Sequence, residues 1–593
     1  MNEYIAALVD ELHRLGVRHV VFSPGSRSTT MAMLFKEHKG FETYMNIDER
    51  SAAFMALGIA KAHKKPAVLV CTSGSAAAHY LPAVLETQYS GVPLIILSAD
   101  RPYTLQHMGA PQTIDQQKLF GTAVNYYEEL SVPREEHFYT YPRQVARRAC
   151  MKAMDLKRGP VHINVPLFEP LVPDFDRKHF EAGRMEQSFS LVTGMLQPSA
   201  IQPVYEAFLN KKVIVLAGPA WGLDEEMAIL ELAHMLKAPI LADPLSNMRR
   251  IDDEHIITSY DAFLADENRR DALQPDCILQ IGQMVVSKRV QQWIGTMDET
   301  TIISVSPTMD YTNSMGNTTM YIQSTAQGLM NGLKRYVVEL HSAGAANATD
   351  MTGISTGAAN TFTGTENIAD GCDQTFDTSI DEYLAAWTAT ESYSRNQLDA
   401  VVEESKLFEG RTIYMLQRFM PKDGQIMSAN SMSIRDMDYF WAGRRSDADV
   451  YGNRGTNGID GTVSTALGLS TNGKTTVLLT GDLSFFHDLN GLAIAKTHEL
   501  NLTIVLHNND GGGIFQYLPQ KGTECFDYLF NTPQGIDYSG LATLYGVDYV
   551  CVRNNADLEA AFAQYIGQSG VHIIEIPTSK EGSRELHKKY RIH

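Results

Sequence analysis

The sequence lacks most of the features that mark secreted, membrane-spanning or metal-thiolate proteins. Its six cysteines are scattered through 593 residues, with no Cys-x-x-Cys pair and no metal-ligand spacing, which favours reduced thiols. The longest apolar runs, VIVLAG and PLIILSA, have the length of strands and cannot cross a bilayer. The N-terminal segment MNEYIAALVDELHRLG has the periodicity of a helix and not the pattern of a signal peptide. We therefore expect a cytoplasmic protein without stable membrane insertion.

Basic residues are also in deficit. Fifty Lys and Arg stand against 69 Asp and Glu, which gives a formal charge of −19. An acidic surface repels nucleic acids and anionic membranes, so we expect neither as a partner. No Walker A motif occurs, and no G-x-G-x-x-G follows the first predicted strand, which disfavours nucleotide-binding folds of those types. The deficit makes arginines on Gly-rich loops more informative, because they do not belong to a generally basic surface.

The chain is too long for one hydrophobic core and predicts several domains. Short β-rich runs alternate with helical stretches, which predicts an α/β fold with doubly wound, mostly parallel sheets. The pattern restarts twice and predicts three such domains, over residues 1–185, 186–341 and 381–593. Residues 342–380 are poor in large apolar side chains and are predicted to form an exposed linker. Ligands are expected at the carboxyl ends of the strands, where the loops gather.

Two loops in the C-terminal third carry the strongest chemical signal. Asp482 follows the apolar run TTVLLTG, and Asn509 follows LTIVLHN, so each is expected at the carboxyl end of a strand. A carboxylate, an amide oxygen and a backbone carbonyl near Gly511 are ligands that Mg²⁺ prefers, with phosphates and water completing its shell. Glycines 511–513 allow close approach to a phosphate. Either loop alone fits ordinary turn chemistry, but both together favour a magnesium–diphosphate site.

Further candidates lie on loops that follow other predicted strands. In DERSAAF, Asp48 can cap a helix and Glu49 can oppose its dipole, so this motif alone has a structural explanation. In SPGSRSTT, Ser28 can cap the next helix, and helix N-termini and arginine forks both favour anions. Each basic residue on such loops could be a solvated surface charge. Their shared position favours one anionic ligand, and the polar and basic candidates are Ser26, Arg27, Arg101, Lys288, Arg289, Ser431, Arg435 and Arg454.

Together these motifs resemble those of the thiamine-diphosphate enzymes. GD followed by NN after one helix and one strand resembles their diphosphate–magnesium motif. That motif usually begins GDG, and here Leu483 takes the place of the second glycine. Seven motifs, taken in order, resemble one branch of these enzymes, the 2-succinyl-5-enolpyruvyl-6-hydroxy-3-cyclohexene-1-carboxylate synthases of the menaquinone pathway. They are SPGSRST, DERSAAF, ADRP, SKR, NRG-NGIDG, GDLSF and NNDGGGIF. GDLSF is typical of that branch. The resemblance implies a pyrimidine-binding, a central and a diphosphate-binding domain, and an active site shared between the subunits of at least a homodimer.

The resemblance also implies the cofactors and the activity. It implies a transferase that uses thiamine diphosphate with Mg²⁺ or Mn²⁺ to decarboxylate 2-oxoglutarate and add the succinyl carbanion to isochorismate. Glu49 would face the aminopyrimidine ring and activate the cofactor, and Ile459 would lie beneath its bent form. Asp482, Asn509 and Gly511 would hold the metal.

The substrate-binding residues follow from the same resemblance. Ser431 and Arg435 would face the distal carboxylate of 2-oxoglutarate. Pro111 stands where the family commonly has Asn, and it lacks both the amide side chain and a backbone N–H. The residues expected to receive isochorismate are Ser26, Arg27, Arg101, Gln112, Lys288 and Arg289, with Arg454 nearby.

Two alternative functions remain open at this point. Another thiamine-diphosphate enzyme, such as a 2-oxoacid decarboxylase or an acetolactate synthase, would keep Glu49, Asp482 and Asn509 but would not require so many carboxylate-binding arginines. A non-catalytic binding protein on the same fold would have no chemical need for Glu49. The presence of that acid beside an intact metal pair favours an enzyme.

Overall fold

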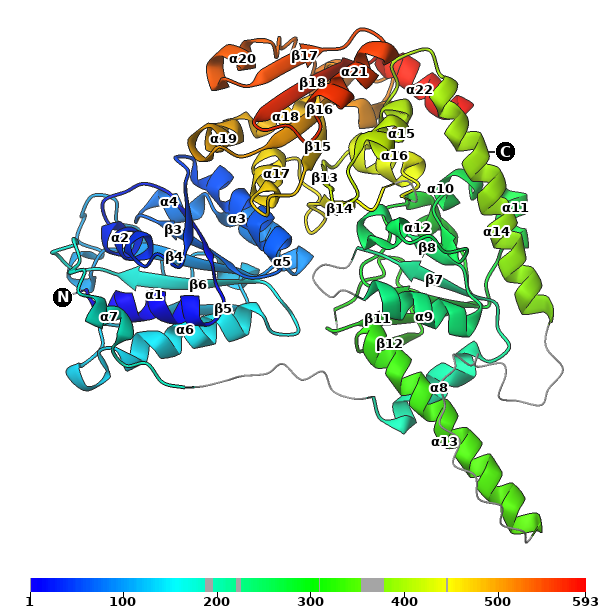
Figure 1. The fold of residues 1–593 in the computed structure, drawn as a ribbon, viewed down its shortest axis with the longest axis horizontal. Coiled ribbons are helices and arrows are strands. Elements are labelled where there is room, and N and C mark those ends of the chain that lie inside the picture. The colour runs from blue at the N-terminus through cyan, green and yellow to red at the C-terminus, as the bar shows by residue number, and fades with distance from the viewer. Residues whose placement is uncertain are drawn as a thin grey trace. The chain divides into compact units, whose positions relative to one another are not determined.

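The computed structural model describes residues 2–186, 196–219, 225–308, 310–352, 378–443 and 446–592 (Figure 1). These residues form three six-stranded sheets with the orders β2-β1-β3-β4-β6-β5, β12-β11-β10-β7-β8-β9 and β14-β13-β15-β16-β18-β17. Every strand pair between described residues is parallel. The prediction of three doubly wound parallel sheets is confirmed. None of the described helices combines the length and the apolar character that crossing a membrane requires.

The described chain divides into two compact units. One comprises Met1–Ser190, Glu404–Ile434 and Ala448–Glu585, and it holds the N-terminal and C-terminal sheets. The other comprises Leu191–Glu403 and the segments Arg435–Asp447 and Leu586–His593, and it holds the central sheet.

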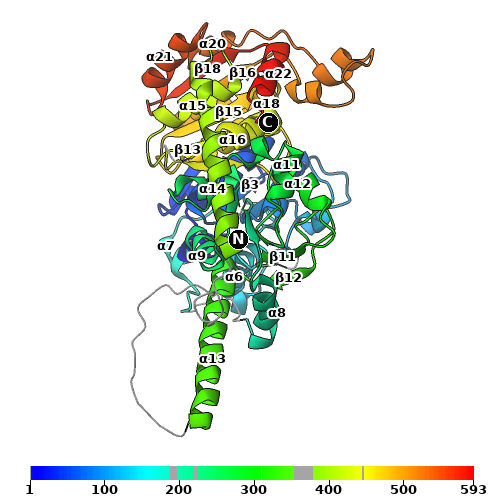
Figure 2. The same ribbon diagram turned by 90° about the vertical axis from the view of Figure 1, so that its right-hand side faces the viewer.

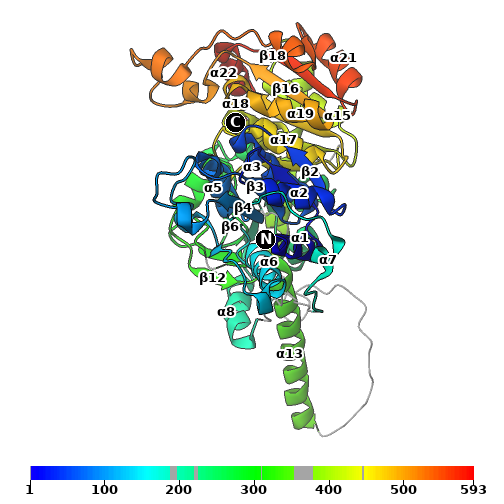
Figure 3. The ribbon, with the colours of Figure 1, turned by 90° about the vertical axis from the view of Figure 1, so that its left-hand side faces the viewer.

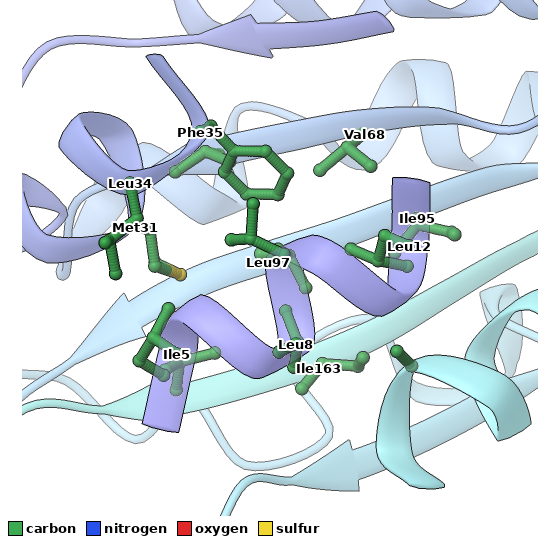
Figure 4. Close-up of a cluster of buried hydrophobic side chains, with 14 of the residues drawn as sticks. Ile5, Leu8, Leu12, Met31, Leu34, Phe35, Val68, Ile95, Leu97 and Ile163 are labelled. Atoms are coloured by element: carbon green, nitrogen blue, oxygen red, sulfur yellow. The ribbon is translucent and has the colours of Figure 1, made fainter. Parts of the chain in front are cut away.

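The N-terminal sheet is covered by helices on both faces (Figures 1 and 3). Side chains of α1 and α2, including Ile5, Leu8 and Phe35, pack with Leu97 and Ile163 of the strands in a buried cluster (Figure 4). The periodicity of the first segment therefore predicted α1 correctly. The elements are α1 (Tyr4–Arg14), β1 (His19–Phe22), α2 (Thr29–Glu37), β2 (Glu42–Met45), α3 (Glu49–His63), β3 (Ala67–Cys71), α4 (Ser75–Ala78), α5 (Leu81–Ser90), β4 (Leu94–Asp100), β5 (Tyr126–Glu129), α6 (Thr140–Ala153), β6 (Pro160–Pro166) and α7 (Arg177–Glu181).

The C-terminal sheet repeats the alternation of strand and helix. Its strands β15 and β16 are neighbours, and Gly481 pairs with His507 at their carboxyl ends. The elements are α15 (Glu409–Phe419), β13 (Gln425–Ser428), α16 (Met432–Phe440), β14 (Asp449–Gly452), α17 (Thr462–Ser470), β15 (Thr476–Gly481), α18 (Asp482–His487), α19 (Leu492–His498), β16 (Leu502–Asn508), α20 (Gly540–Tyr545), β17 (Asp548–Cys551), α21 (Asn555–Tyr565), β18 (Val571–Pro577) and α22 (Lys580–Lys589).

Helices α3 and α17 join the N-terminal and C-terminal sheets within the first unit. A Cβ on Gly58 would lie 2.1 Å from the carbonyl oxygen of Thr465, and a Cβ on Gly468 would lie 2.1 Å from that of Met55. Only glycine permits this approach of two helix backbones, because any side chain would occupy the space of the opposite helix. α3 is buried from Ser51 through Lys61.

The central sheet has its own core, formed by strands and by the helices α8, α9 and α13. Figure 2 shows the long helices α13 and α14. The elements are α8 (Pro198–Phe208), β7 (Val213–Ala217), α9 (Glu226–Leu236), β8 (Ile240–Ala242), β9 (Ile256–Ile257), α10 (Tyr260–Phe263), α11 (Glu267–Ala272), β10 (Cys277–Ile281), α12 (Lys288–Gly295), β11 (Thr301–Ser306), β12 (Met320–Gln323), α13 (Ala326–Thr352) and α14 (Thr378–Asp399).

The predicted linker, residues 342–380, overlaps both long helices. Its first residues, 342–352, continue α13, and its last, 378–380, begin α14. Alanine is the best helix former, and residues 343, 345, 346 and 348 are alanines. Residues 353–377 lie outside the described residues. The predicted domain boundaries themselves stay a prediction.

Candidate cofactor and substrate site

Asp482 and Asn509 follow adjacent parallel strands at the same edge of the C-terminal sheet. β15 ends at Gly481 and β16 at Asn508, so the two following loops leave the sheet side by side. The carboxylate of the buried Asp482 accepts a hydrogen bond of 2.7 Å from the backbone N–H of Gly511. The expectation that neighbouring strands bring these loops together therefore holds.

The residues of these two loops fit a divalent cation that carries a diphosphate. The side-chain Oδ1 of Asn509 is buried without a hydrogen-bond partner among the described residues, a state that costs about 1–3 kcal/mol unless a ligand binds the atom. A Cβ on Gly513 would lie 2.8 Å from the amide nitrogen of Asn509. A Cβ on Gly511, whose φ is 139°, would lie 2.1 Å from the carbonyl oxygen of Asn531. A carboxylate, an unpaired amide oxygen and closely approaching backbone form the donor set that Mg²⁺ prefers.

The electrostatics of this edge favour an incoming cation beside an anion. Burial raises the pKa of Asp482 to about 6, against the opposing effects of backbone N–H donors and of Lys580. Lys580 donates hydrogen bonds of 2.6 Å to the carbonyl oxygen of Asp510 and to Oδ1 of Asn531. A buried carboxylate is therefore ionised at neutral pH at a cost that a bound cation would offset.

Glu49 is the first residue of α3. Asp48 caps this helix, because its carboxylate accepts hydrogen bonds from the backbone N–H groups of Arg50 and Ser51, at 2.9 and 3.3 Å. Glu49 is half-buried, and its charge contributes, after burial, to raising the pKa of Cys71 to about 12. The prediction that Asp48 is the cap and Glu49 a first-turn acid is confirmed.

Arg27 and Arg101 lie in loops that follow β1 and β4. The buried Arg27 donates from Nη1 to the carbonyl oxygen of Leu167, at 3.1 Å, and its Nη2 lies 3.3 Å from the carboxylate of Glu169. Burial and the positive charge of Arg101 lower the pKa of Arg27. Arg101 donates from Nη2 to the carbonyl oxygen of Pro111, at 3.0 Å. Arg27 is thus already paired with a carboxylate of the protein, that of Glu169, while Arg101 contributes a second positive charge nearby.

The loops around these arginines correct one expectation and qualify another. Ser28 occupies the N-cap position of α2 but makes no capping hydrogen bond, so the predicted cap is wrong. Its φ and ψ of −81° and 2° differ from the extended cap geometry, and its hydroxyl donates to the carbonyl oxygen of Gly25 instead. Pro111 lacks an N–H, yet its carbonyl oxygen receives Arg101. Ser26 and Gln112 are exposed.

The loop of residues 452–460, between β14 and α17, carries Arg454 and Ile459. Arg454 donates from Nη1 to Oδ1 of Asn430, at 2.7 Å. The side-chain amide of Asn430 donates in turn to two backbone carbonyls of the loop, at 2.6 and 2.8 Å. Ile459 is 37% exposed, so a large apolar side chain is left accessible at the end of a heavily bonded loop. An apolar ligand surface would cover it favourably.

In the second unit, Asp261 is close to two of the predicted substrate-binding arginines. Arg289 lies 2.9 Å from the carboxylate of Asp261, and Ser287, the N-cap of α12, also donates to that carboxylate. Burial lowers the pKa of Arg435, and nearby carboxylates, that of Asp261 among them, oppose this effect. Lys288 is exposed at the start of α12. Asp261 was not singled out from the sequence, because it lies in α10, far from the SKR motif that carries its partner.

The predicted site residues thus form several local groups. No hydrogen bond or ion pair between described residues joins Glu49 to Asp482, Asn509 or Gly511. Three residues that sequence reasoning missed hold the Arg454 loop: Asn430, Lys61 and Glu86. Asn430 stands directly before Ser431 and could have been found from that motif. Lys61 and Glu86 lie inside helices and carry no local signal.

Comparison with known families defines the class of this protein. Residues 3–119 match the N-terminal TPP binding domain of thiamine pyrophosphate enzymes, residues 186–334 the middle domain, and residues 437–576 the C-terminal TPP binding domain. The solved structure of benzoylformate decarboxylase from Polynucleobacter necessarius superposes with a TM-score of 0.68 at 16% identity, over 97% of this chain and 98% of that one. At that identity the likeness shows the fold alone. The protein is a thiamine pyrophosphate enzyme.

Relatives of known name narrow the class to one family. The chain is 49% identical to the 2-succinyl-5-enolpyruvyl-6-hydroxy-3-cyclohexene-1-carboxylate synthase of Lactococcus lactis subsp. lactis (strain IL1403), over 100% of this chain and 99% of the relative. It is 43% identical to the synthase of the same name from Desulfitobacterium hafniense (strain DSM 10664 / DCB-2), over 99% of both. The chain belongs to the 2-succinyl-5-enolpyruvyl-6-hydroxy-3-cyclohexene-1-carboxylate synthase family.

Proposed function

We propose that this protein decarboxylates 2-oxoglutarate and adds the resulting succinyl carbanion to isochorismate, which gives 2-succinyl-5-enolpyruvyl-6-hydroxy-3-cyclohexene-1-carboxylate and CO₂ in menaquinone biosynthesis. The bond between the carboxylate carbon and the keto carbon of 2-oxoglutarate breaks and releases CO₂. The former keto carbon then forms the new bond to the ring, one ring C=C bond of isochorismate is consumed, and a proton adds to the neighbouring ring carbon that bears the carboxylate. The observation that carries this proposal is the end-to-end likeness, at 49% and 43% identity, to synthases named for this product.

The cofactor is thiamine diphosphate, held through Mg²⁺ or Mn²⁺ at the edge of the C-terminal sheet. Asp482, Asn509 and the backbone at Gly511 would hold the metal, and the buried unpaired Oδ1 of Asn509 supports this assignment. Thiamine diphosphate supplies the electron sink that lets the keto carbon lose CO₂ and then act as a nucleophile. The exposed Ile459 would pack beneath it.

Glu49 is the activating acid in this proposal, and it acts in a dimer. Its carboxylate would bond the aminopyrimidine ring and favour the tautomer that removes the reactive proton of the cofactor. The match to both the N-terminal and the C-terminal TPP binding domains of thiamine pyrophosphate enzymes, a family whose active sites lie between subunits, supports a site completed by the C-terminal sheet of a second copy. At least a homodimer is then required for activity.

The arginine loops account for the substrates. Each substrate has two carboxylates, and arginine binds a carboxylate in a fixed bidentate geometry. Arg27 and Arg101, on loops that follow two strands of the N-terminal sheet, would bind isochorismate with Ser26 and Gln112. Isochorismate would also be bound by Lys288 and Arg289, with Arg454 nearby. Ser431 and Arg435 would face the distal carboxylate of 2-oxoglutarate.

The test is to identify products by mass after incubation with thiamine diphosphate, Mg²⁺ and 2-oxoglutarate, with and without isochorismate. The expected result is the succinyl-cyclohexene product in the presence of both substrates. Release of succinic semialdehyde at the same rate whether or not isochorismate is present would indicate a 2-oxoacid decarboxylase instead. Absence of any consumption of 2-oxoglutarate by cofactor-loaded protein would overturn the assignment as an enzyme.

A further inference from the structure

Two charged side chains of the N-terminal sheet's helices bind the loop that carries Arg454. Lys61, near the end of α3, donates from Nζ to the carbonyl oxygen of Gly452, at 2.6 Å, and to Oδ1 of Asn453, at 2.9 Å. Glu86, in α5, is also buried, at 1% exposed. Its carboxylate accepts from the backbone N–H groups of residues 455 and 456, at 2.9 and 2.7 Å, and from the hydroxyl of residue 456, at 3.0 Å.

The contacts bracket Arg454 on both sides. Lys61 binds the two residues before it, and Glu86 binds the two residues after it. The backbone on the Glu86 side approaches closely, since a Cβ on Gly455 would lie 2.5 Å from the carbonyl oxygen of Glu86. Arg454 itself donates to Asn430, at 2.7 Å. The loop is therefore fixed before, at and after the arginine.

Simple packing of two domains does not explain these charges. Burying an ammonium and a carboxylate is costly unless each is fully bonded, and well-packed apolar side chains often serve stability as well or better. The charges of Lys61 and Glu86 attract each other, but no ion pair joins them among the described residues, and each side chain makes its hydrogen bonds to the loop. The nearby contact of α3 with α17 already packs through glycines. The charges therefore fix the course of one loop, and α3 and α17 do not need them to pack.

We propose that Lys61 and Glu86 are positioning residues that fix the guanidinium of Arg454 for the carboxylates of isochorismate. This inference rests on the proposed function. Neither residue touches the substrate. Both act through residues 452–456, so their loss weakens isochorismate binding more than it affects decarboxylation of 2-oxoglutarate.

The variant that tests this with the least disturbance is Glu86→Gln. Glutamine keeps the size but turns one acceptor oxygen into an amide donor, which opposes the donors of the loop. The KM for isochorismate is expected to rise about tenfold or more, as for loss of a charge-assisted hydrogen bond. Oxidative decarboxylation of 2-oxoglutarate alone, followed with an artificial electron acceptor, is expected to change less than about twofold. Glu409→Gln is the matched control, since Glu409 is a buried acid that binds Thr578 and Ser583.

A double-mutant cycle separates positioning from general weakening of the fold. If Glu86 acts through Arg454, Glu86→Gln adds little in an Arg454→Ala background, so the two effects are strongly non-additive. Fully additive effects, or equal losses in both reactions, would overturn the proposal. Lys61→Arg keeps the charge and is expected to retain more isochorismate affinity than Lys61→Met. If Glu86→Gln does not fold, Thr456→Val removes one bond to Glu86 from an exposed position and gives a smaller shift in the same direction.

A readout without substrate distinguishes failure of this inference from failure of the proposed function. Hydrogen exchange of the amides of residues 455 and 456, and tryptic cleavage after Arg454, are expected to accelerate in Glu86→Gln holoenzyme but not in Glu409→Gln. Unchanged exchange would show that Glu86 does not hold the loop. Faster exchange with an unchanged KM for isochorismate would refute the positioning role. If wild type forms no product from both substrates, the proposed function fails and the positioning of Arg454 for isochorismate fails with it. The exchange data then still decide whether the loop is held.

Discussion

The carboxylate of Asp482 accepts a hydrogen bond of 2.7 Å from the backbone N–H of Gly511, across the carboxyl ends of two adjacent strands. This bond joins the loop after β15 to the glycine loop after β16. Oδ1 of Asn509 is buried without a partner among the described residues. The geometry of the metal end is therefore set by the protein before any cation arrives, which favours tight binding because little has to be reorganised.

Replacement of Asp482 by Asn is expected to abolish metal-dependent retention of thiamine diphosphate. The change removes the negative charge and sets an amide group against the N–H of Gly511 or the metal. The loss of affinity should exceed the roughly 10–100-fold that loss of an outer metal partner costs. Titration of the cofactor at fixed Mg²⁺, followed by protein fluorescence, measures it. Asp537→Asn, which alters an exposed turn at Ser539, should leave the affinity unchanged.

The affinity for Mg²⁺ should depend on pH through Asp482. Burial raises the pKa of this group to about 6, and only the ionised form can bind the metal. The affinity is therefore expected to fall as the pH is lowered through about 6 and to be nearly constant above about 7. The folding stability of the metal-free protein should change with pH in the opposite direction to the Mg²⁺ affinity. Because the pKa of Asp482 is raised on folding, the contribution of this carboxyl group to stability declines as the pH rises from about 4 to about 6. Mg²⁺ titrations from acidic to neutral pH would contradict this if they showed no change.

Glu49→Gln should remove turnover while leaving cofactor binding largely intact. Glutamine keeps the size and a hydrogen-bonding group but cannot supply the charge that favours the reactive tautomer. A loss of roughly 10²–10⁴-fold in kcat is expected, as for an acid–base group. Steady-state product formation and cofactor titration are to be measured on the same preparation. Turnover like that of wild type would refute the role of Glu49.

Gly513→Ala should weaken the metal site without unfolding the protein. The new Cβ would lie 2.8 Å from the amide nitrogen of Asn509 and must displace that side chain. Gly540→Ala is the control, because nothing lies within 4 Å of a Cβ there. We expect the cofactor affinity of Gly513→Ala to be about tenfold lower, within the range seen for changes around metal ligands. The affinity of Gly540→Ala should equal that of wild type. Equal affinities would show that the orientation of Asn509 does not matter.

Gly58→Ala should destabilise the protein, although alanine usually stabilises a helix by about 0.5–1 kcal/mol relative to glycine. A Cβ at this position would lie 2.1 Å from the carbonyl oxygen of Thr465. Overpacking of this kind costs about 1–3 kcal/mol or more, which outweighs the helix preference. The control is Gly582→Ala in α22, where the nearest atom to an added Cβ is 3.4 Å away and alanine should be neutral or stabilising. The midpoints of urea unfolding of the two variants are to be compared with that of wild type. A higher midpoint for Gly58→Ala would contradict the close helix contact.

Features determined by local sequence could be predicted, and those determined by distant partners could not. Alternating apolar runs predicted the sheets, and the position of Asp482 and Asn509 at strand ends predicted their adjacency, because parallel strands end at one edge. The cap at Ser28 failed because the backbone there is not extended. Lys61 and Glu86 were missed because their partners are 391 and 369 residues away in the chain. No local pattern marks a charge that is bonded over such a separation.

Helix α3 carries Glu49 as its first residue and Lys61 about three turns later, roughly 18 Å away along the axis. An α-helix that is buried from Ser51 through Lys61 and packed backbone to backbone against α17 cannot stretch between its ends. Any displacement of Glu49 along the axis must therefore move Lys61 by the same distance, and with it the course of the Arg454 loop. Helix α3 therefore links the position of Glu49, the proposed activating acid, to that of Arg454, a proposed substrate-binding arginine. A substitution in the middle of α3 should disturb both together.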